Sequence, residues 1–181
     1  MTPSLAEQGL PGVLGGVLTD DVAFRAWYDA TLPRVYAYLY HRCGRDRALA
    51  EELTQQTFVD AIRTHGRTTA DDRVKWVIGI ARHRLADHFR ALERRERSVL
   101  RLVSDRRAPE VTWVGPREAD DDVADALRRL PAAQRAALVL RYVDDQPVRE
   151  VARLLGRSEG AVESLLSRGR EALRRTLGDE R

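Results

Sequence analysis

The chain has 181 residues, which is enough for one ordinary domain or two small ones. Hydrophobic residues make up 43% of it and can form a packed core, while the 33% of charged residues exceeds the share of about a quarter that is usual. The single cysteine, Cys43, excludes an internal disulfide, and no apolar run reaches the length of a membrane span. We therefore expect a cytoplasmic protein that is not inserted in a membrane.

Residues 1–20 form a segment that is apolar in places but has no basic region of the kind that opens a signal peptide. Pro11 and several glycines interrupt it, so it cannot continue as a helix. We interpret it as a flexible N-terminal tail.

Two helices are predicted to follow the tail. From Phe24 to Leu39, apolar residues recur at steps of three and four, which is typical of an amphipathic helix, and Pro33 predicts a break or kink within it. Gly44 marks a turn. A second helix is expected at about 47–63, and its inward face should hold Leu49, Leu53, Thr57, Phe58, Ala61 and Ile62.

A third helix is expected from Asp72 to beyond Arg97, after a loop at 65–70. Its apolar residues are Trp76, Ile80, Leu85, Phe89 and Leu92. Between residues 73 and 107 there are eleven lysines and arginines against four acids, a local excess of seven positive charges. Such an excess suits a polyanion such as nucleic acid, although a solvated helix face would also explain it.

The helical pattern stops at 104–122, where Pro109, Gly115, Pro116 and a run of three aspartates suggest an interdomain linker. It resumes at 123–130, 132–142, 148–155 and 159–177. The predicted fold is therefore all-α, with two small helical domains at 21–103 and 123–181 joined by this linker.

The second domain contains the spacing of a helix-turn-helix. Two helices that cross closely need a small residue, a turn residue that tolerates positive φ, and a buried apolar anchor. Ala152, Gly156 and Val162 supply these in order. Pro147 is suited to the start of the first helix, and Ser158 can cap the second. We therefore predict a DNA-binding helix-turn-helix.

The second helix of this motif, at 159–174, would be the recognition helix. Its first half should face the major groove, while Arg170, Arg174 and Arg175 could reach phosphates. The residues that we expect to face DNA are Ser158, Glu159, Gly160, Ala161, Glu163, Ser164, Ser167 and Arg168.

Three blocks taken together resemble the extracytoplasmic-function (ECF) sigma factors of bacterial RNA polymerase. The block at 50–58, AEELTQQTF, is similar to the family's polymerase-binding helix. The block at 76–90, WVIGIARHRLADHFR, is similar to the helix that opens and reads the −10 element. Residues 130–141, 150–152 and 158–168 resemble the −35-reading domain. The resemblance covers about residues 24–173.

The resemblance implies partners and roles. Core RNA polymerase would be bound through its β′ clamp helices and β flap, promoter DNA would be read, and an anti-sigma factor would commonly hold the protein. The implied polymerase-binding residues are Glu52, Leu53, Gln55, Gln56 and Phe58. The implied −10-reading residues are Lys75, Trp76, Arg82, His83, Arg84, Asp87 and Arg90. Trp76 offers a face on which an unpaired base can stack, and the loop at 64–73 stands where the family holds a flipped base.

The sequence departs from the family pattern at four positions. His83 replaces the usual Asn, and Ala161 replaces a Thr at the start of the recognition helix. Glu163 and Leu165 stand where Lys or Arg is common. A carboxylate at Glu163 would repel phosphate but could accept a hydrogen bond from cytosine N4. We therefore expect weaker binding to the −35 element than is usual, with much of the affinity coming from polymerase and the −10 domain.

Two other classes of protein, an enzyme and a repressor, fit the sequence less well. An enzyme could use Glu51 and Glu52, or His83 and Asp87, but two such groups make an incomplete site. We therefore expect no catalytic residue, no metal and no cofactor. A repressor with a helical effector domain would explain the helix-turn-helix but neither of the first two blocks.

Overall fold

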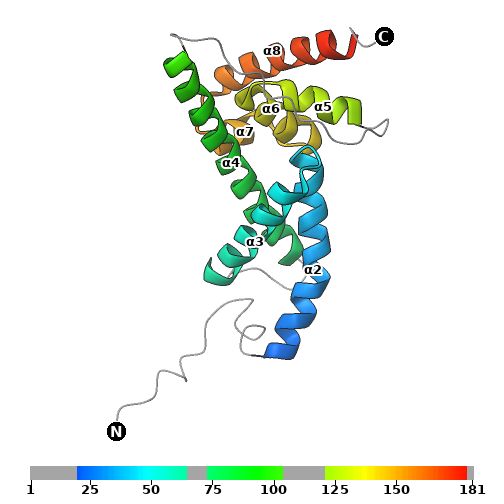
Figure 1. Cartoon of the computed structure of the whole chain (residues 1–181). Coiled ribbons are helices and arrows are strands. Elements are labelled where there is room, and N and C mark those ends of the chain that lie inside the picture. Colours follow the sequence, from blue (N-terminus) through cyan, green and yellow to red (C-terminus); the bar gives the residue numbers. More distant parts are fainter. Residues whose placement is uncertain (1–19, 65–72, 104–120, 179–181) are drawn as a thin grey trace. The chain divides into compact units, whose positions relative to one another are not determined.

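The computed structural model describes residues 20–64, 73–103 and 121–178, and all the regular elements among them are helices (Figure 1). The predicted all-α class is confirmed. Residues 1–19 of the expected tail, the loop at 65–70 and residues 104–120 of the expected linker lie outside the described residues. Tertiary contacts divide the chain into two compact units, Met1–Leu85 and Ala86–Arg181.

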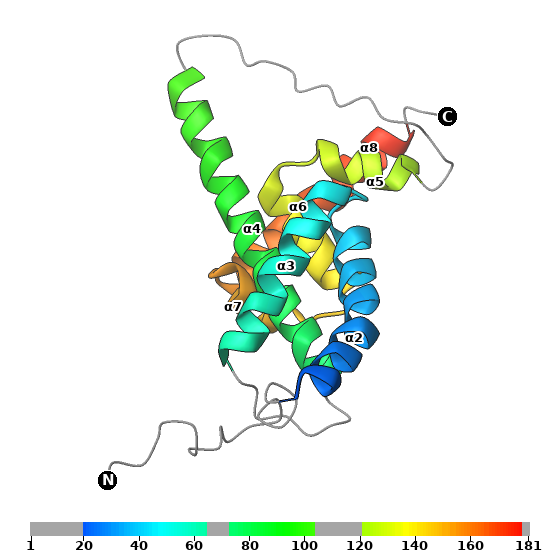
Figure 2. The same cartoon turned by 60° about the horizontal axis from the view of Figure 1, so that its bottom comes forward.

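The first unit contains α2 (Asp21–Arg42), α3 (Arg47–Thr64) and the beginning of α4 (Arg73–Val103). Asp20 caps α2 by accepting a hydrogen bond from the Val22 amide at 2.9 Å. Gly44 and Arg45 both have positive φ, at 68° and 62°, and they reverse the chain so that α2 and α3 pack together (Figure 2). The turn predicted at Gly44 is confirmed.

Aromatic and small apolar residues form the core between α2 and α3. Val35 and Leu39 of α2 and Ala50 and Ala61 of α3 have no exposed surface. The Phe58 ring lies 5.6 Å from the ring of Trp27 and 4.7 Å from that of Tyr28, measured between centroids. Aromatic pairs at these separations add to the stability of a core beyond the area that they bury.

The break expected at Pro33 does not occur, because α2 continues without interruption from Asp21 to Arg42. Proline removes one backbone hydrogen bond from a helix interior. Here Thr31 and Val35 are buried on either side of an exposed Pro33, so tertiary packing holds the helix where its local sequence disfavours it.

Replacing Pro33 by alanine should therefore stabilise the protein. The substitution restores a backbone donor and costs no buried contact, because Pro33 is exposed. We expect a gain of about 1–3 kcal/mol in the free energy of unfolding, measured by urea denaturation of the full chain. Arg34 is next to Pro33 and is also exposed, so Arg34→Ala is the control and should change stability by less than about 0.5 kcal/mol. A loss of stability in Pro33→Ala would contradict this account of α2.

In α4, which is 31 residues long, the buried face agrees with the predicted one in part. Leu85 and Phe89 are buried as expected, at 0% and 4% exposure. Val77, Ala81 and Leu85 recur at steps of four and have no exposed surface. Trp76 and Ile80, which were expected on this face, are only half-buried. Trp76 is therefore partly accessible on the surface of α4.

The second unit contains α5 (Asp121–Arg129), α6 (Ala132–Leu138), η2 (Val139–Val143), α7 (Val148–Leu155) and α8 (Glu159–Gly178). Helix α8 packs against each of α5, α6 and α7 (Figure 1). Leu140, Val151 and Val162 have no exposed surface and form the middle of this core.

The helix expected at 132–142 changes its winding partway along. After Leu138 the chain forms a π-helical turn, in which the Asp144 amide donates to the Val139 carbonyl at 3.0 Å. The wider turn leaves Tyr142 and Val143 exposed at the end of the element. The Tyr142 hydroxyl accepts a hydrogen bond from Arg170 of α8 at 2.7 Å.

Helix α6 has no side-chain cap of its own, because Pro131 occupies its N-cap position. A carboxylate from the part of α4 that belongs to the second unit takes this role. Both oxygens of Glu96 accept from the Ala132 amide, at 3.0 and 3.2 Å. The Glu96 carboxylate at the N-terminus of α6 also interacts favourably with the dipole of that helix. A second acid of α4, Glu93, forms an ion pair with Arg157.

Candidate nucleic-acid interface

Helices α7 and α8 form the helix-turn-helix that the spacing predicts. Gly156 ends α7 in the left-handed conformation, with φ 63° and ψ 44°. Ala152 is 5% exposed and Val162 is fully buried, as a close helix crossing requires. These three residues have the roles that the sequence assigned to them.

The N-terminus of α8 is open to solvent and is capped as expected. Ser158 accepts a hydrogen bond from the Ala161 amide through its hydroxyl, at 3.3 Å. Ala161 is half-buried, and the rest of the predicted recognition face is exposed, namely Ser158, Glu159, Gly160, Glu163, Ser164, Ser167 and Arg168. The exposed face has the form that insertion into a major groove requires.

Leu165 does not belong to this face. It is only 6% exposed and packs in the core of the unit, next to the buried Leu166. The expectation that Leu165 alters DNA affinity is therefore wrong, because its side chain points away from the surface that DNA can reach. Glu163 and Ala161 remain as departures on or beside the exposed face.

Helix α7 carries a positively charged side chain beside the turn, Arg153, which is paired with an acid of the same helix. Arg153 donates to both carboxylate oxygens of Glu150, at 2.9 and 2.6 Å. The hydrogen bond and the negative charge of Glu150 raise the pKa of Arg153. The guanidinium stays charged, but the carboxylate beside it reduces the positive potential that it offers to a phosphate.

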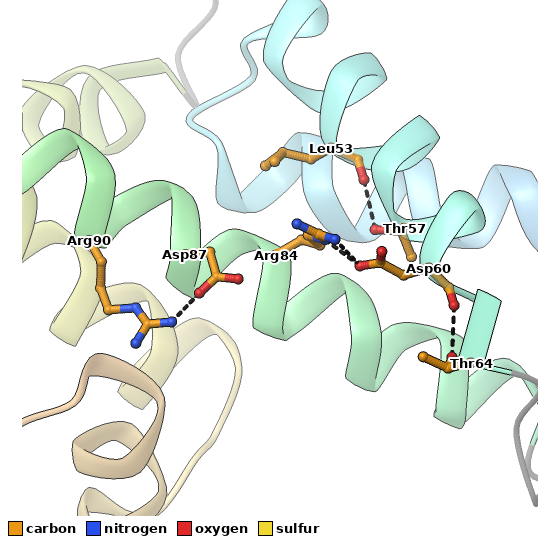
Figure 3. Close-up of polar contacts among 7 residues, drawn as sticks. All are labelled: Leu53, Thr57, Asp60, Thr64, Arg84, Asp87 and Arg90. Atoms are coloured by element: carbon orange, nitrogen blue, oxygen red, sulfur yellow. Dashed lines mark hydrogen bonds and ion pairs between the residues drawn. The ribbon is translucent and has the colours of Figure 1, made fainter. Parts of the chain in front are cut away.

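The predicted −10-reading residues all lie on α4, and their side chains differ in exposure. Lys75, His83 and Asp87 are exposed, whereas Trp76, Arg82, Arg84 and Arg90 are half-buried. Two of the arginines are engaged by acids: Arg84 forms an ion pair with Asp60 of α3, and Arg90 forms one with Asp87 (Figure 3).

The predicted polymerase-binding block, residues 50–58, forms the middle half of α3, and only part of it is accessible. Glu52 and Gln55 are exposed, and the half-buried Gln56 donates to Glu52 at 3.0 Å. Leu53 and Phe58 are 3% and 4% exposed, so they cannot contact a partner directly. The helical period turns these two residues toward the core, so their predicted role as direct polymerase contacts is wrong.

Two apolar residues that the sequence did not predict to be accessible extend the exposed face of α3. Val59 is 44% exposed, and Ile62, which was expected to face inward, is 37% exposed. Together with Glu52 and Gln55 they follow the three- and four-residue steps of one helix face. The spacing of Val59 and Ile62 from the polar Glu52 and Gln55 could have identified them in the sequence as accessible, because residues at these steps lie on the same side of a helix.

Among the described residues, no group of three or more His, Cys, Asp or Glu side chains could hold a metal ion. None of the described helices has both the length and the hydropathy needed to cross a membrane. The features of the described surface that could bind a partner are the exposed face of α8 and the basic side chains of the long helix α4.

Comparison with known families defines the class of this arrangement. Residues 27–95 match Sigma-70 region 2, and residues 120–173 match Sigma-70 region 4. The first match contains α3 and most of α4, and the second contains the helix-turn-helix. The fold and the matched regions are therefore those of a sigma-70 type factor.

Similar proteins narrow the class further. The chain is 36% identical over 164 residues to the ECF RNA polymerase sigma factor BldN of Streptomyces coelicolor, with 87% of this chain and 61% of BldN covered. It is 33% identical over 162 residues to the RNA polymerase sigma factor CarQ of Myxococcus xanthus, with 87% of this chain and 90% of CarQ covered. The chain belongs to the ECF sigma factors of RNA polymerase.

A solved structure has a related fold. The sigma factor RpoE of Bartonella quintana, crystallised with the anti-sigma factor NepR, aligns with a TM-score of 0.55 at 23% identity. The alignment covers 87% of this chain and 98% of RpoE. At this identity the likeness concerns the fold alone.

Proposed function

We propose that this protein is a sigma factor that binds core RNA polymerase and directs it to specific promoters for transcription initiation. The observation that supports this most strongly is the presence of both sigma regions in one chain, each with an accessible helix in the corresponding position. A repressor would account for α7 and α8 but not for the exposed polar face of α3.

Each of the two domains would recognise one element of the promoter. In this proposal α4 reads the −10 element and helps to melt it. Basic side chains act on the DNA backbone, and the half-buried Trp76 supplies a surface on which an unpaired base stacks. Helix α8 reads the −35 element. The working domains would be residues 21–103 and 123–181, with 104–122 as the linker between them.

Polymerase would be bound by the exposed face of α3, through its β′ clamp helices, with a second contact from the β flap to the C-terminal domain. The polar Glu52 and Gln55 beside the apolar Val59 and Ile62 form a surface of the mixed character that protein interfaces have. Leu53 and Phe58 would act by holding α3 on the core.

Further parts of the proposal concern regulation and place of action. We propose an anti-sigma factor as a partner, by analogy with RpoE, which was crystallised with one. The protein would act in the cytoplasm, where the polymerase is, and would have no catalytic activity of its own.

The decisive test mixes the full chain with core RNA polymerase. Comigration on a sizing column, followed by promoter-dependent transcription from the reconstituted enzyme, is the expected result. Tight, sequence-specific duplex binding by the full chain alone, without polymerase association, would instead support a repressor. Metal-dependent turnover that is lost in His83→Ala would support an enzyme.

Glu163 and Arg168 should affect DNA binding in different ways. If Glu163 accepts from a cytosine, Glu163→Ala should relax preference at one −35 base pair by about 1–3 kcal/mol. Arg168→Ala should weaken binding to all sequences alike and lower the salt slope by about one, as loss of a phosphate contact does. Binding of the holoenzyme to a panel of single-base −35 variants, at several salt concentrations, separates the two. Unchanged base preference in Glu163→Ala would mean that this carboxylate does not read a base.

A further inference from the structure

Arg84 lies partway along α4 with its side chain 34% exposed, and its guanidinium is turned toward α3 (Figure 3). Its Nε and Nη2 atoms both reach the same oxygen of Asp60, Oδ2. Asp60 is 24 positions earlier in the sequence and its side chain is 22% exposed. The ion pair is therefore a tertiary contact between two helices and not a local pair along one helix.

The surroundings of this pair hold both partners in place. Ala61 and Leu85, each the next residue after a member of the pair, have no exposed surface. Asp60 lies in the last turns of α3, where the Thr64 hydroxyl donates to the Asp60 carbonyl at 2.7 Å (Figure 3). The carboxylate and the guanidinium thus meet at the edge of a packed apolar region, where solvent screens charges less than at an open surface.

The Asp87–Arg90 pair offers a contrast on the same helix. Its two members are one turn apart on α4, and their side chains are 49% and 41% exposed. Such a pair fixes no second helix. Ion pairs of this exposure contribute little to stability, so an exchange of the Asp87 carboxylate for a phosphate would cost Arg90 little.

We infer that Arg84 is a positioning residue, which holds the −10-reading helix α4 on the polymerase-binding helix α3 through Asp60, and that it does not bind DNA phosphate. The inference rests on the proposed function for its meaning in transcription. If Arg84 turned to a phosphate, it would leave Asp60 without its counter-charge near the negatively charged DNA backbone, which is unfavourable. Through this pair, the helix that would meet polymerase and the helix that would meet the promoter keep one relative orientation.

A double-mutant cycle tests the inference. The variants are Asp60→Ala, Arg84→Ala, the two combined, and the exchanged pair Asp60→Arg with Arg84→Asp. The probe is a promoter duplex recovered from a random-sequence pool by the wild-type holoenzyme. The measurements are its affinity for each variant holoenzyme at several salt concentrations, and urea unfolding of each full chain.

If Arg84 positions α4, both single variants should weaken the promoter complex by a similar factor of roughly three to ten. The combined variant should be no weaker than either, the exchanged pair should recover part of the loss, and the salt slope should stay unchanged. Arg90→Ala is the comparison: if Arg90 reaches phosphate, that variant lowers the salt slope by about one.

Other outcomes would overturn the inference. If Arg84 contacts phosphate, Arg84→Ala lowers the salt slope, while Asp60→Ala frees the guanidinium and tightens binding, so the two variants act in opposite directions. Additive effects of the two substitutions on urea unfolding, or no effect of either on binding, would also exclude the positioning role. Failure of the proposed function looks different, because wild-type chain would then form no holoenzyme and recover no DNA. The unfolding cycle still reports in that case whether Asp60 and Arg84 are coupled.

Discussion

Replacing Gly169 by alanine is expected to destabilise the helix-turn-helix unit. Gly169 is buried in α8 where that helix meets α6, and a Cβ atom there would lie 2.9 Å from Leu138 Cδ1 and 3.2 Å from Leu138 Cγ. Leu138 is itself only 4% exposed, so its side chain has little room to move aside. Overpacking of this kind costs about 1–3 kcal/mol, and we expect a loss in that range from the free energy of unfolding.

Urea denaturation of the full chain, followed by circular dichroism, measures the change, and hydrogen exchange at the amides of α6 and α8 localises it. Gly160→Ala is the matched control, because the same methyl group meets nothing within 4 Å there. It should leave stability unchanged or raise it by up to about 1 kcal/mol, since alanine favours a helix over glycine. If both variants unfold alike, the approach of α6 and α8 does not require a glycine.

Glu52→Arg is expected to weaken the binding of core polymerase about 10- to 100-fold, equivalent to about 1–3 kcal/mol. Glu52 is exposed near the start of the α3 face and accepts a hydrogen bond from Gln56. The substitution reverses a charge and removes that bond without opening the core. Fluorescence anisotropy of the labelled full chain against core polymerase gives the affinity directly.

The control for this variant is Asp29→Arg, which makes the same change of charge at an exposed position of α2. Both variants should keep the circular dichroism spectrum and unfolding midpoint of the wild type, and only Glu52→Arg should lose affinity. Equal losses in both would mean that net charge, and not the α3 face, governs binding. No loss in Glu52→Arg would place the polymerase contact elsewhere on the chain.

Sequence alone was sufficient for the features that depend on local chemistry. Helix periodicity identified the helices, and Gly156 and Ser158 marked the turn and the cap of the helix-turn-helix, because left-handed geometry and capping depend on a few adjacent residues. The order of the three sequence blocks also pointed to the family that the comparisons show.

Only the tertiary structure decided where the buried face of each helix ends and its accessible face begins. Successive residues of a helix are separated by about 100° of rotation, so a small error in phase exchanges a buried residue for an exposed one. For this reason Leu165 proved to be a core residue, and Ile62, which was expected to face inward, proved to be exposed. Leu53 is buried, as its place in the helical period indicated, and only the family resemblance had offered it as a contact to polymerase. In α4 the sequence identified the buried Leu85 and Phe89, but toward the start of the helix Val77 and not Trp76 is buried.

Contacts between residues that are distant along the chain could not be predicted from the sequence either. Pro33 disfavours a helix locally, yet the buried residues on either side of it hold α2 continuous. In the sequence Arg84 is one of many basic residues of its helix and was expected to act on DNA. Its ion pair with Asp60 depends on how α3 and α4 pack. Local propensity and spacing thus determined the helices and the recognition motif, whereas packing determined which side chains are accessible, because burial and ion pairing depend on neighbours that the linear order does not specify.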